Sequence, residues 1–374
     1  MLYIRRGDFF AFRKEFRVMM EYQNNNGNYD KRNRRKNQKR KLLFYRAACA
    51  MLGLLIVSVI FGTVYFLRES KDLDLPSKEN IKTGKDYSFL ADDQSEEESP
   101  VSEPAISNRA NAIDLNIIAA NAIVVNKDTD ALLYQKNGTD RIAPASTAKM
   151  ITALTVLEYC SPEDEMRVGA EIEMIHSDSS TAWLMKGDTL TVRQLLIALM
   201  LPSGNDAAYT LAVNTGKTIA GDNSLSNQQA IQIFMDKVNE KAKAIGVTDS
   251  NFVVPDGYDA EGQYTTAYDL AIIAKACLEN PIISEIVASN TSYERWPNGR
   301  EVTYNNSNEL LDPNSPYYRP QVIGLKTGTS SLGGACVVSA AVIDGETYIC
   351  VVMGSTKESR FQDSVDILDK IKAR

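Results

Sequence analysis

The distribution of hydrophobic and polar positions divides the chain into an apolar run, a polar stretch and a long region of periodic patterns. Residues 47–67 form an uncharged run of 21 residues, long enough to cross a bilayer as one helix. Residues 68–111 are rich in acidic side chains and poor in apolar ones. Such a composition is typical of a disordered linker, because it cannot bury a core. We therefore expect one folded domain at residues 112–374.

Within this domain, strand patterns lie at both ends and helical patterns in the middle. Strands are expected at 117–125, 131–136, 322–328, 335–343 and 347–353. Helices are expected at 191–201, from 206, at 230–244, at 266–278 with Thr265 as its cap, and at 362–371. From about 170 to 310 most patterns are helical. This order predicts an α+β fold, one sheet layer with a helical insertion.

Charge orients the apolar run. Residues 1–46 hold 14 Lys and Arg against 4 Asp and Glu, so residues 47–374 carry a net charge of −17 in a chain of −7. Basic residues directly before a membrane helix keep that side in the cytoplasm. We therefore expect these residues to orient the helix in the membrane and not to bind nucleic acid. No small-x-small cleavage site follows the run, so we expect an uncleaved anchor and an extracellular domain. Translation from Met19 or Met20 would leave this layout unchanged.

The cysteines and the single histidine point away from disulfide and metal chemistry. If Asp344-Gly345 is a two-residue hairpin turn, Cys350 pairs with Ser339, and its thiol faces away from that of Cys336. We expect all five cysteines to be unpaired. His176 stands alone, without a Cys-x-x-Cys motif, so we expect no metal and no cofactor.

Candidate catalytic residues come first from Pro144 to Ile151. Apolar positions from Met150 onward recur at helical spacing, and Pro144 suits the start of a helix. Ser146 and Lys149 then share one face of the first turn. A serine beside a lysine is a nucleophile beside a base, provided that burial or a nearby positive charge lowers the pKa of the lysine. Taken alone, the pair is more readily explained as a helix cap with a solvated lysine.

Two further motifs follow in the chain. Ser203-Gly204-Asn205 lies in the turn between two expected helices, where an ordinary cap would also fit. Lys326-Thr327-Gly328-Thr329 begins within the expected strand at 322–328, and period two places Lys326 between two glycines on one face. Open backbone beside glycines suits the close approach of an extended ligand. An exposed lysine on an edge strand is the ordinary alternative.

Together, Ser-x-x-Lys, Ser-x-Asn and Lys-Thr-Gly in this order resemble the penicillin-recognising serine hydrolases. The chain is more closely similar to the D-alanyl-D-alanine carboxypeptidases, the low-molecular-mass penicillin-binding proteins. The resemblance runs from about 117 to 361 and includes the words Ser-Gly-Asn-Asp-Ala-Ala and Gly-Leu-Lys-Thr-Gly-Thr. It implies an antiparallel sheet flanked by helices, a mostly helical subdomain at about 170–310, and a cleft between them.

The resemblance also implies roles for the motif residues. Ser146 would attack the carbonyl between the two D-alanines of a peptidoglycan stem peptide, and Lys149 would take its proton. Burial and Lys326 would lower the pKa of Lys149. Ser203 would relay a proton to the leaving amine. The further substrate-binding residues would be Asn205, Lys326, Thr327, Gly328, Thr329 and Arg360, with the N–H groups of Ser146 and Thr329 as the oxyanion hole.

Other activities share parts of this motif set. An endopeptidase that cuts peptidoglycan crosslinks would use the same catalytic residues and remains an alternative to the carboxypeptidase. A class A β-lactamase would add Glu-x-x-Leu-Asn, which the sequence lacks. A β-lactam sensor would need an intracellular output domain, for which residues 1–46 are too poor in apolar side chains. We expect β-lactams to act as covalent inhibitors, and the membrane to be a partner through residues 47–67.

Overall fold

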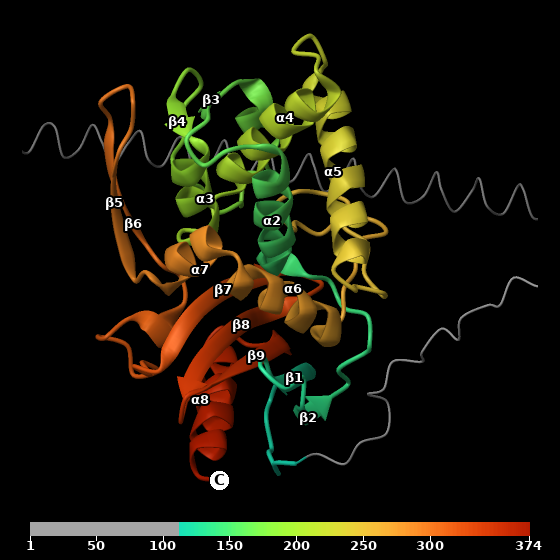
Figure 1. The fold of residues 1–374 in the computed structure, drawn as a ribbon, viewed down its shortest axis with the longest axis vertical. Helices are drawn as coiled ribbons and strands as arrows, with labels where there is room; N and C mark the ends of the chain where they lie inside the picture. The colour runs from blue at the N-terminus through green and yellow to red at the C-terminus, as the bar shows by residue number, and fades with distance from the viewer. Residues whose placement is uncertain (1–111) are drawn as a thin grey trace, which may run out of the picture. The chain divides into compact units, whose positions relative to one another are not determined.

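A computed structural model describes residues 112–374 of the chain, and Figure 1 shows their fold. The predicted basic tail, anchor and linker lie outside the described residues. Within 112–374, no helix has both the length and the apolar character that crossing a membrane requires.

The centre of the described region is a five-stranded antiparallel sheet in the order β2-β1-β9-β8-β7. Its strands are β1 (Asn121–Asn126), β2 (Leu132–Lys136), β7 (Val322–Ser330), β8 (Gly334–Ile343) and β9 (Glu346–Ser355). All five predicted strands are confirmed, because apolar residues on both sheet faces are buried against helices. The fold is thus the predicted α+β fold.

The hairpin of β8 and β9 has the predicted register. Ile343 pairs with Glu346, and Ser339 pairs with Cys350. Asp344 and Gly345 both have positive φ, the backbone that a tight two-residue hairpin turn requires. Cys336 and Cys350 are buried on opposite faces of the sheet, each in a different apolar cluster, and both are free. The two-residue period thus separates these thiols as expected.

Most helices gather on one side of the sheet, above it in Figure 1. They are α2 (Lys149–Tyr159), α3 (Val192–Met200), α4 (Asn205–Ala220), α5 (Asn227–Ala244), α6 (Ala267–Glu279) and α7 (Pro281–Ala288), with the short 3₁₀ turns η2 (Ala145–Ala148) and η3 (Ala170–Met174). A third 3₁₀ turn, η4 (Glu309–Leu311), buries its leucines in the other apolar cluster, with Phe361 and Val365. The last helix, α8 (Ser359–Lys372), packs on β8 and β9 from the other side.

Side-chain caps fix where several helices begin. Thr191 and Gln194 form a capping box at α3, and Ser226 and Gln229 form another at α5. The cap of α6 is Thr266, whose hydroxyl accepts the N–H of Asp269. The prediction that Thr265 caps this helix was wrong by one residue. The backbone of Thr265 pairs with Ile142, and its hydroxyl contacts Ser250 Oγ.

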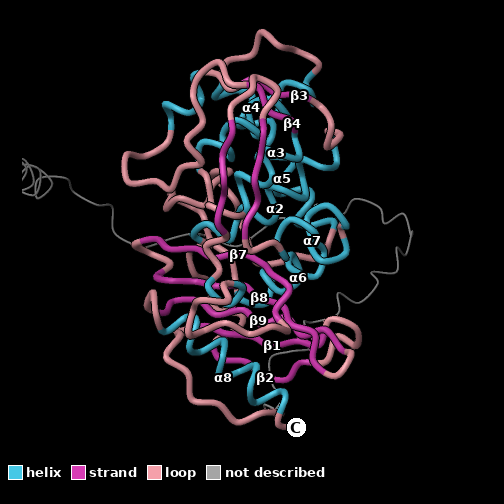
Figure 2. The backbone as a smooth tube through the Cα atoms, turned by 90° about the vertical axis from the view of Figure 1, so that its left-hand side faces the viewer, coloured by secondary structure: helices cyan, strands magenta, loops and turns pink. Residues whose placement is uncertain are grey.

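The middle of the chain contains two hairpins that the helical prediction missed. One joins β3 (Glu165–Arg167) to β4 (Thr189–Thr191), and the other joins β5 (Thr291–Arg295) to β6 (Glu301–Asn305). Figure 2 shows β5 and β6 running from the level of β7 toward α3 and α4. Their alternating burial and the Pro-Asn-Gly turn between them are ordinary hairpin signals.

Candidate active site

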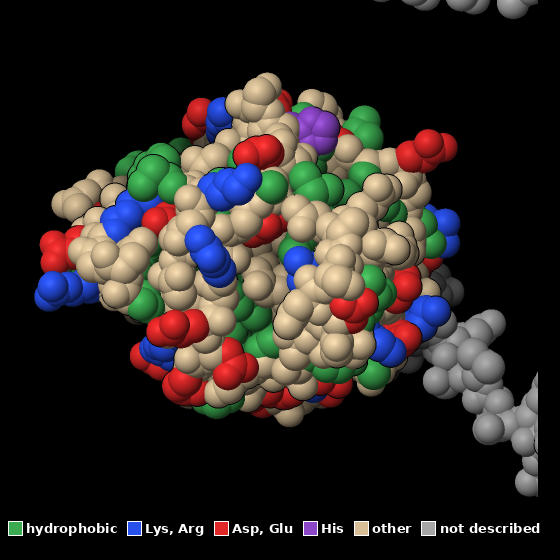
Figure 3. Space-filling view, turned by 90° about the horizontal axis from the view of Figure 1, so that it is seen from above, with side chains coloured by type: hydrophobic (Ala, Val, Ile, Leu, Met, Phe, Trp, Pro, Cys, Tyr) green, Lys and Arg blue, Asp and Glu red, His purple; other side chains and the backbone are tan. Residues whose placement is uncertain are grey.

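All three motifs border one cavity of about 560 Å³. The cavity is lined by Ser146 of η2, by Ser203 and Asn205 at the start of α4, and by residues of β7. Figure 3 gives a view of the molecule from above, over the helices. The lining residues are Ser146, Asp178, Ser179, Ser180, Pro202, Ser203, Asn205, Gly257, Tyr258, Asp259, Ser307, Thr327, Gly328, Thr329, Ser330, Ser331, Lys357 and Arg360. Segments more than 200 residues apart in the sequence therefore share this one space.

The 3₁₀ turn η2 sets the position of Ser146. Sequence periodicity predicts one helix from Pro144, whereas the chain makes the tight turn Ala145–Ala148 first and enters α2 at Lys149. Side chains three residues apart eclipse each other in a 3₁₀ turn. Lys149 Nζ consequently lies 2.9 Å from Ser146 Oγ. The predicted pairing of serine and lysine is present, and the tighter turn accounts for it.

Lys149 is fully buried and makes three polar contacts through its ammonium nitrogen. Besides Ser146 Oγ, these are Asn205 Oδ1 at 2.7 Å and the backbone carbonyl of Asp256 at 2.8 Å. Burial lowers the pKa of Lys149 to about 8, and the negative charges of Asp256 and Asp206 oppose that decrease. A lysine with this pKa exists in both protonation states near neutral pH, as a base requires.

The contacts of Lys149 also orient its neutral form. An uncharged amine has two N–H donors and one lone pair. Asn205 Oδ1 and the carbonyl oxygen of Asp256 can only accept, so they hold the two N–H groups. The lone pair then points at Ser146 Oγ, the remaining contact. This geometry leaves Lys149 able to accept the hydroxyl proton of Ser146.

The turn before α4 brings Ser203 and Asn205 to the cavity. A Cβ on Gly204 would come within 2.7 Å of Ala182 Cβ and 2.9 Å of Ala198 O, so the turn packs too closely for a larger residue. Ser203 itself has a φ of +66°. Asp206, which follows Asn205, accepts the N–H of Ala182 on both carboxylate oxygens and thereby ties the segment after Ser180 to α4. Asp206 does not line the cavity, and the sequence did not indicate this supporting contact.

Lys326 lies on β7, an edge strand, but it is 1% exposed, which excludes the reading as a solvated edge lysine. Its Nζ donates to the carbonyl of Thr327 at 2.9 Å. Burial, and then the charges of Lys149 and Arg360, lower the pKa of Lys326 well below its usual range. The charge of Lys149 is thus one cause of the low pKa of Lys326. Of the two causes expected for the low pKa of Lys149, burial is the one that the structure gives, and Lys326 is not among its causes.

Gly328 allows β7 to lie directly against η2. A Cβ at this position would meet Ala145 Cβ and Ser146 N, both at 3.0 Å. Any larger residue would therefore separate the strand from the nucleophile. The absence of a side chain brings the backbone around Thr329 to the same end of the cavity as Ser146.

Arg360, at the start of α8, reaches across to β7 as the resemblance implies. Its Nη1 donates to Gly328 O at 2.9 Å and to Thr329 Oγ1 at 3.1 Å. Burial lowers the pKa of the Arg360 guanidinium, although arginine stays charged at physiological pH. Its Nε is buried, with no hydrogen-bond partner among the described residues. Arg360 thus places a positive charge directly beside Thr329.

A loop at 252–263, which sequence reasoning also missed, completes the site. Gly257 has a φ of +78°, and a Cβ there would stand 1.9 Å from Ala145 O. This close approach places the carbonyl of Asp256 on Lys149. The word Pro-Asp-Gly at 255–257 is a turn signal, but turn chemistry alone does not reveal which carbonyl it directs inward.

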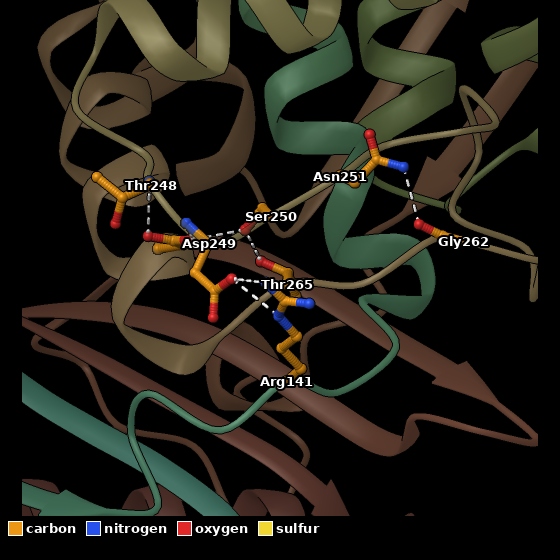
Figure 4. A network of polar contacts seen from close by, with 8 residues as sticks. Arg141, Thr248, Asp249, Ser250, Asn251, Gly262 and Thr265 are labelled. Carbon is orange, nitrogen blue, oxygen red and sulfur yellow. Dashed lines mark hydrogen bonds and ion pairs between the residues drawn. The ribbon is translucent and has the colours of Figure 1, made fainter. Parts of the chain in front are cut away.

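Polar contacts close this loop at its base (Figure 4). Arg141 binds the Asp249 carboxylate through Nε at 2.8 Å, and Ser250 Oγ lies 2.8 Å from Thr265 Oγ1. Asn251 Nδ2 donates to Gly262 O at 2.8 Å. With its two ends held together, the loop tip keeps its place beside Lys149.

His176 matches no catalytic position. It is exposed, and its ring stacks on that of Tyr258 with centroids 3.8 Å apart. The Tyr258 hydroxyl donates to Asp178 at 3.1 Å. These side chains join two loops, and Asp178 and Tyr258 line the cavity.

Comparison with known proteins agrees with this geometry. A family profile described as D-alanyl-D-alanine carboxypeptidase, peptidase S11, matches residues 107–357. The chain belongs to the D-alanyl-D-alanine carboxypeptidase family. It is 30% identical over 257 residues to D-alanyl-D-alanine carboxypeptidase DacF of Bacillus subtilis, and 32% identical over 265 residues to the D-alanyl-D-alanine carboxypeptidase of Streptomyces sp. strain K15.

The alignments cover 67% and 68% of this chain, and 61% and 87% of the Bacillus and Streptomyces proteins. The chain thus spans less than two thirds of the Bacillus relative. The crystal structure of the Streptomyces K15 DD-transpeptidase superposes with a TM-score of 0.63 at 30% identity, covering 70% of this chain and all but 1% of the other. A Mycobacterium tuberculosis D-alanyl-D-alanine carboxypeptidase structure gives 0.60 at 28% identity, covering 73% and 96%.

Proposed function

We propose that this chain is a serine D-alanyl-D-alanine carboxypeptidase that removes the terminal D-alanine from peptidoglycan stem peptides. The observation that carries the proposal is Lys149, a buried base held by Asn205 and Asp256 with its remaining contact on Ser146. Family membership supplies the substrate class, peptides ending in D-Ala-D-Ala.

Acylation follows from this geometry. Neutral Lys149 accepts the proton of Ser146, whose oxygen attacks the carbonyl between the D-alanines. The backbone N–H groups of Ser146 and Thr329 stabilise the oxyanion that forms. Ser203 relays this proton: it gives its own hydroxyl proton to the leaving amine and receives the proton held by Lys149, so that D-alanine departs and Lys149 is neutral again. Water then hydrolyses the acyl-enzyme, with Lys149 again as the base.

Recognition of the terminal carboxylate falls to the end of the cavity beside Arg360. Thr327 and Thr329 donate hydroxyl hydrogen bonds, and Arg360 holds Thr329 in place and adds positive charge. A bound carboxylate would favour the protonated form of Lys326, whose pKa burial lowers. Asn205 binds the substrate amide while it orients Lys149.

The same proposal extends to the layout of the whole chain. Residues 1–46 form a basic cytoplasmic tail, 47–67 a single membrane anchor and 68–111 an acidic disordered linker. Residues 112–374 form the extracellular catalytic domain, with its mostly helical subdomain at about 170–310. A reporter that is active only in the cytoplasm, fused after Arg374, is expected to be inactive. Release of a shortened protein into the medium would instead identify a cleaved signal.

Full-length protein in detergent, incubated with a diacyl-Lys-D-Ala-D-Ala peptide, tests the activity. We expect free D-alanine from the wild type and none from Ser146→Ala. A wild type that releases no D-alanine from this peptide but cleaves crosslinked stem-peptide dimers would favour the endopeptidase. Rapid catalytic destruction of penicillin would favour a β-lactamase.

A further inference from the structure

Ser307 is a cavity residue that belongs to none of the three motifs. It follows β6, and its Oγ lies 2.6 Å from Thr327 Oγ1. Both side chains line the cavity together with Ser203. A hydroxyl pair at this distance is a direct hydrogen bond between side chains that come from different elements.

The backbone around Ser307 is held on both sides. Its own N–H donates to Leu201 O at 3.0 Å, just before the turn that carries Ser203. The preceding Asn306 donates its N–H to Asn290 O at 2.7 Å and accepts the N–H of Asn308 on its side chain at 3.0 Å. A residue fixed in this way presents its hydroxyl in a defined place.

The direction of the hydrogen bond between Ser307 and Thr327 decides what Thr327 can do. Each hydroxyl has one proton to donate and lone pairs to accept. If Thr327 donates to Ser307, Thr327 has only lone pairs left for the cavity, and these repel an anion. If Ser307 donates to Thr327, the Thr327 proton is free to bind a carboxylate oxygen.

Resting on the proposed function, we propose that Ser307 is a positioning residue, which turns the Thr327 hydroxyl toward the terminal carboxylate of the substrate. Ser307 itself touches no reacting atom. The Ser307 hydroxyl donates its proton to Thr327 Oγ1 and does not accept one from it. The proton of Thr327 is then free to bind an oxygen of the carboxylate. The guanidinium of Arg360, whose Nη1 lies 3.1 Å from Thr329 Oγ1 in the same cavity, favours the same ligand.

The test compares two substrates in three full-length proteins: wild type, Ser307→Ala and Ser307→Thr. One substrate is diacyl-Lys-D-Ala-D-Ala, and the other is the same peptide with a terminal carboxamide. On the acid, Ser307→Ala is expected to raise KM about tenfold with little change in kcat, since a charge-assisted hydrogen bond is weakened. On the carboxamide, wild type and Ser307→Ala are expected to differ less than threefold. Ser307→Thr keeps a hydroxyl and should restore KM.

Fluorescent-penicillin labelling of each variant first shows that it is folded. An equal loss of kcat/KM on both substrates, or a loss in Ser307→Thr as large as in Ser307→Ala, would overturn the proposal, since it would indicate packing of the wall alone. If the wild type releases no D-alanine from the peptide with a free terminal carboxylate, the proposed function itself is overturned. This result is obtained before any variant is compared.

Discussion

The two faces of the sheet differ in what they bury. The face toward α8 is almost wholly apolar, with Phe361, Val365 and Leu368 packed over strand residues such as Val337 and Val352. The face toward η2 and α2 is also apolar for most of its area, but the two lysines and the asparagine of the site are buried beside it.

This difference separates stability from chemistry. Apolar side chains on the α8 face stabilise the fold in proportion to the area that they remove from water. A buried ammonium group opposes folding unless it is fully hydrogen-bonded. Lys149 has three hydrogen-bond partners, whereas Lys326 has one among residues 112–374, the carbonyl of Thr327. A substrate carboxylate beside Lys326 would supply a further partner for its ammonium group, which suits the site to an anion.

The largest expected effect comes from removing the base. Lys149→Met keeps the length and apolar stem of the side chain, and should lower the rate of acylation by about 10⁴-fold because no other group can take the Ser146 proton. Its effect on the melting temperature should be small beside that loss. Stopped-flow acylation with a chromogenic β-lactam and thermal melts measure both quantities. Wild-type acylation by this variant would remove Lys149 from the mechanism.

Lys326→Ala should lower peptide turnover by about 10²-fold, the scale for loss of one strong electrostatic contact in a dry site. Activity should rise with pH through the titration of Lys149, whose pKa burial lowers to about 8, because only neutral Lys149 is a base. Because burial is the cause of the low pKa of Lys149, we expect this rising limb to keep its place in Lys326→Ala. A limb that moves to higher pH would restore Lys326 as the cause of the low pKa.

Asp256→Asn should have a smaller and opposite effect. The Asp256 charge raises the pKa of Lys149, so its removal should lower that pKa and move the rising limb of the pH–rate profile to lower pH. Turnover at pH 7 should then increase severalfold. The amide oxygen can still accept the N–H of Tyr258, as the carboxylate now does at 3.0 Å, so the loop keeps its shape. A limb that stays in place would show that the carboxylate does not act on Lys149.

The α8 face supplies the control with the smallest effect on turnover. Leu368→Ala should reduce the free energy of unfolding by about 2–5 kcal/mol, since it leaves a cavity in an apolar core. Below the melting transition its kcat/KM should match the wild type. Chemical denaturation measures the free energy of unfolding, and D-alanine release at 20 °C measures kcat/KM. A large loss of turnover in the folded variant would mean that this face also shapes the site.

Sequence periodicity was sufficient where one element buries one continuous face. It predicted the five strands and the register of β8 with β9, because alternation and the Asp344-Gly345 turn act locally. It missed β5 and β6, whose half-exposed alternation lay in a region dominated by helical patterns. It also extended one helix through η2, since a 3₁₀ turn and the first turn of an α-helix have nearly the same spacing.

The motif residues of the site were predictable, but their surroundings were not. Ser146, Ser203, Asn205, Thr327, Thr329 and Arg360 do line one cavity, with Lys149 and Lys326 buried at its base. The carbonyl of Asp256 and the hydroxyl of Ser307 carry no sequence signal of their own, because a backbone carbonyl looks alike at every residue and serine is common. Only the folded chain brings them within 3 Å of Lys149 and Thr327.

The central claim is that Ser146 is the nucleophile and that its acyl-enzyme is hydrolysed readily only after D-alanine has left. Intact-mass spectrometry of the full-length protein mixed with excess penicillin, followed over time and by peptide mapping, tests it most directly. We expect one penicilloyl group on the peptide that contains Ser146, persisting for many minutes, while the stem peptide turns over in seconds or less. The barrier to hydrolysis of the penicilloyl group should therefore be higher than that of the peptide acyl group, by about 1.4 kcal/mol for each tenfold difference in rate. An adduct on another residue, or rapid return to the unmodified mass with catalytic loss of the drug, would contradict the account.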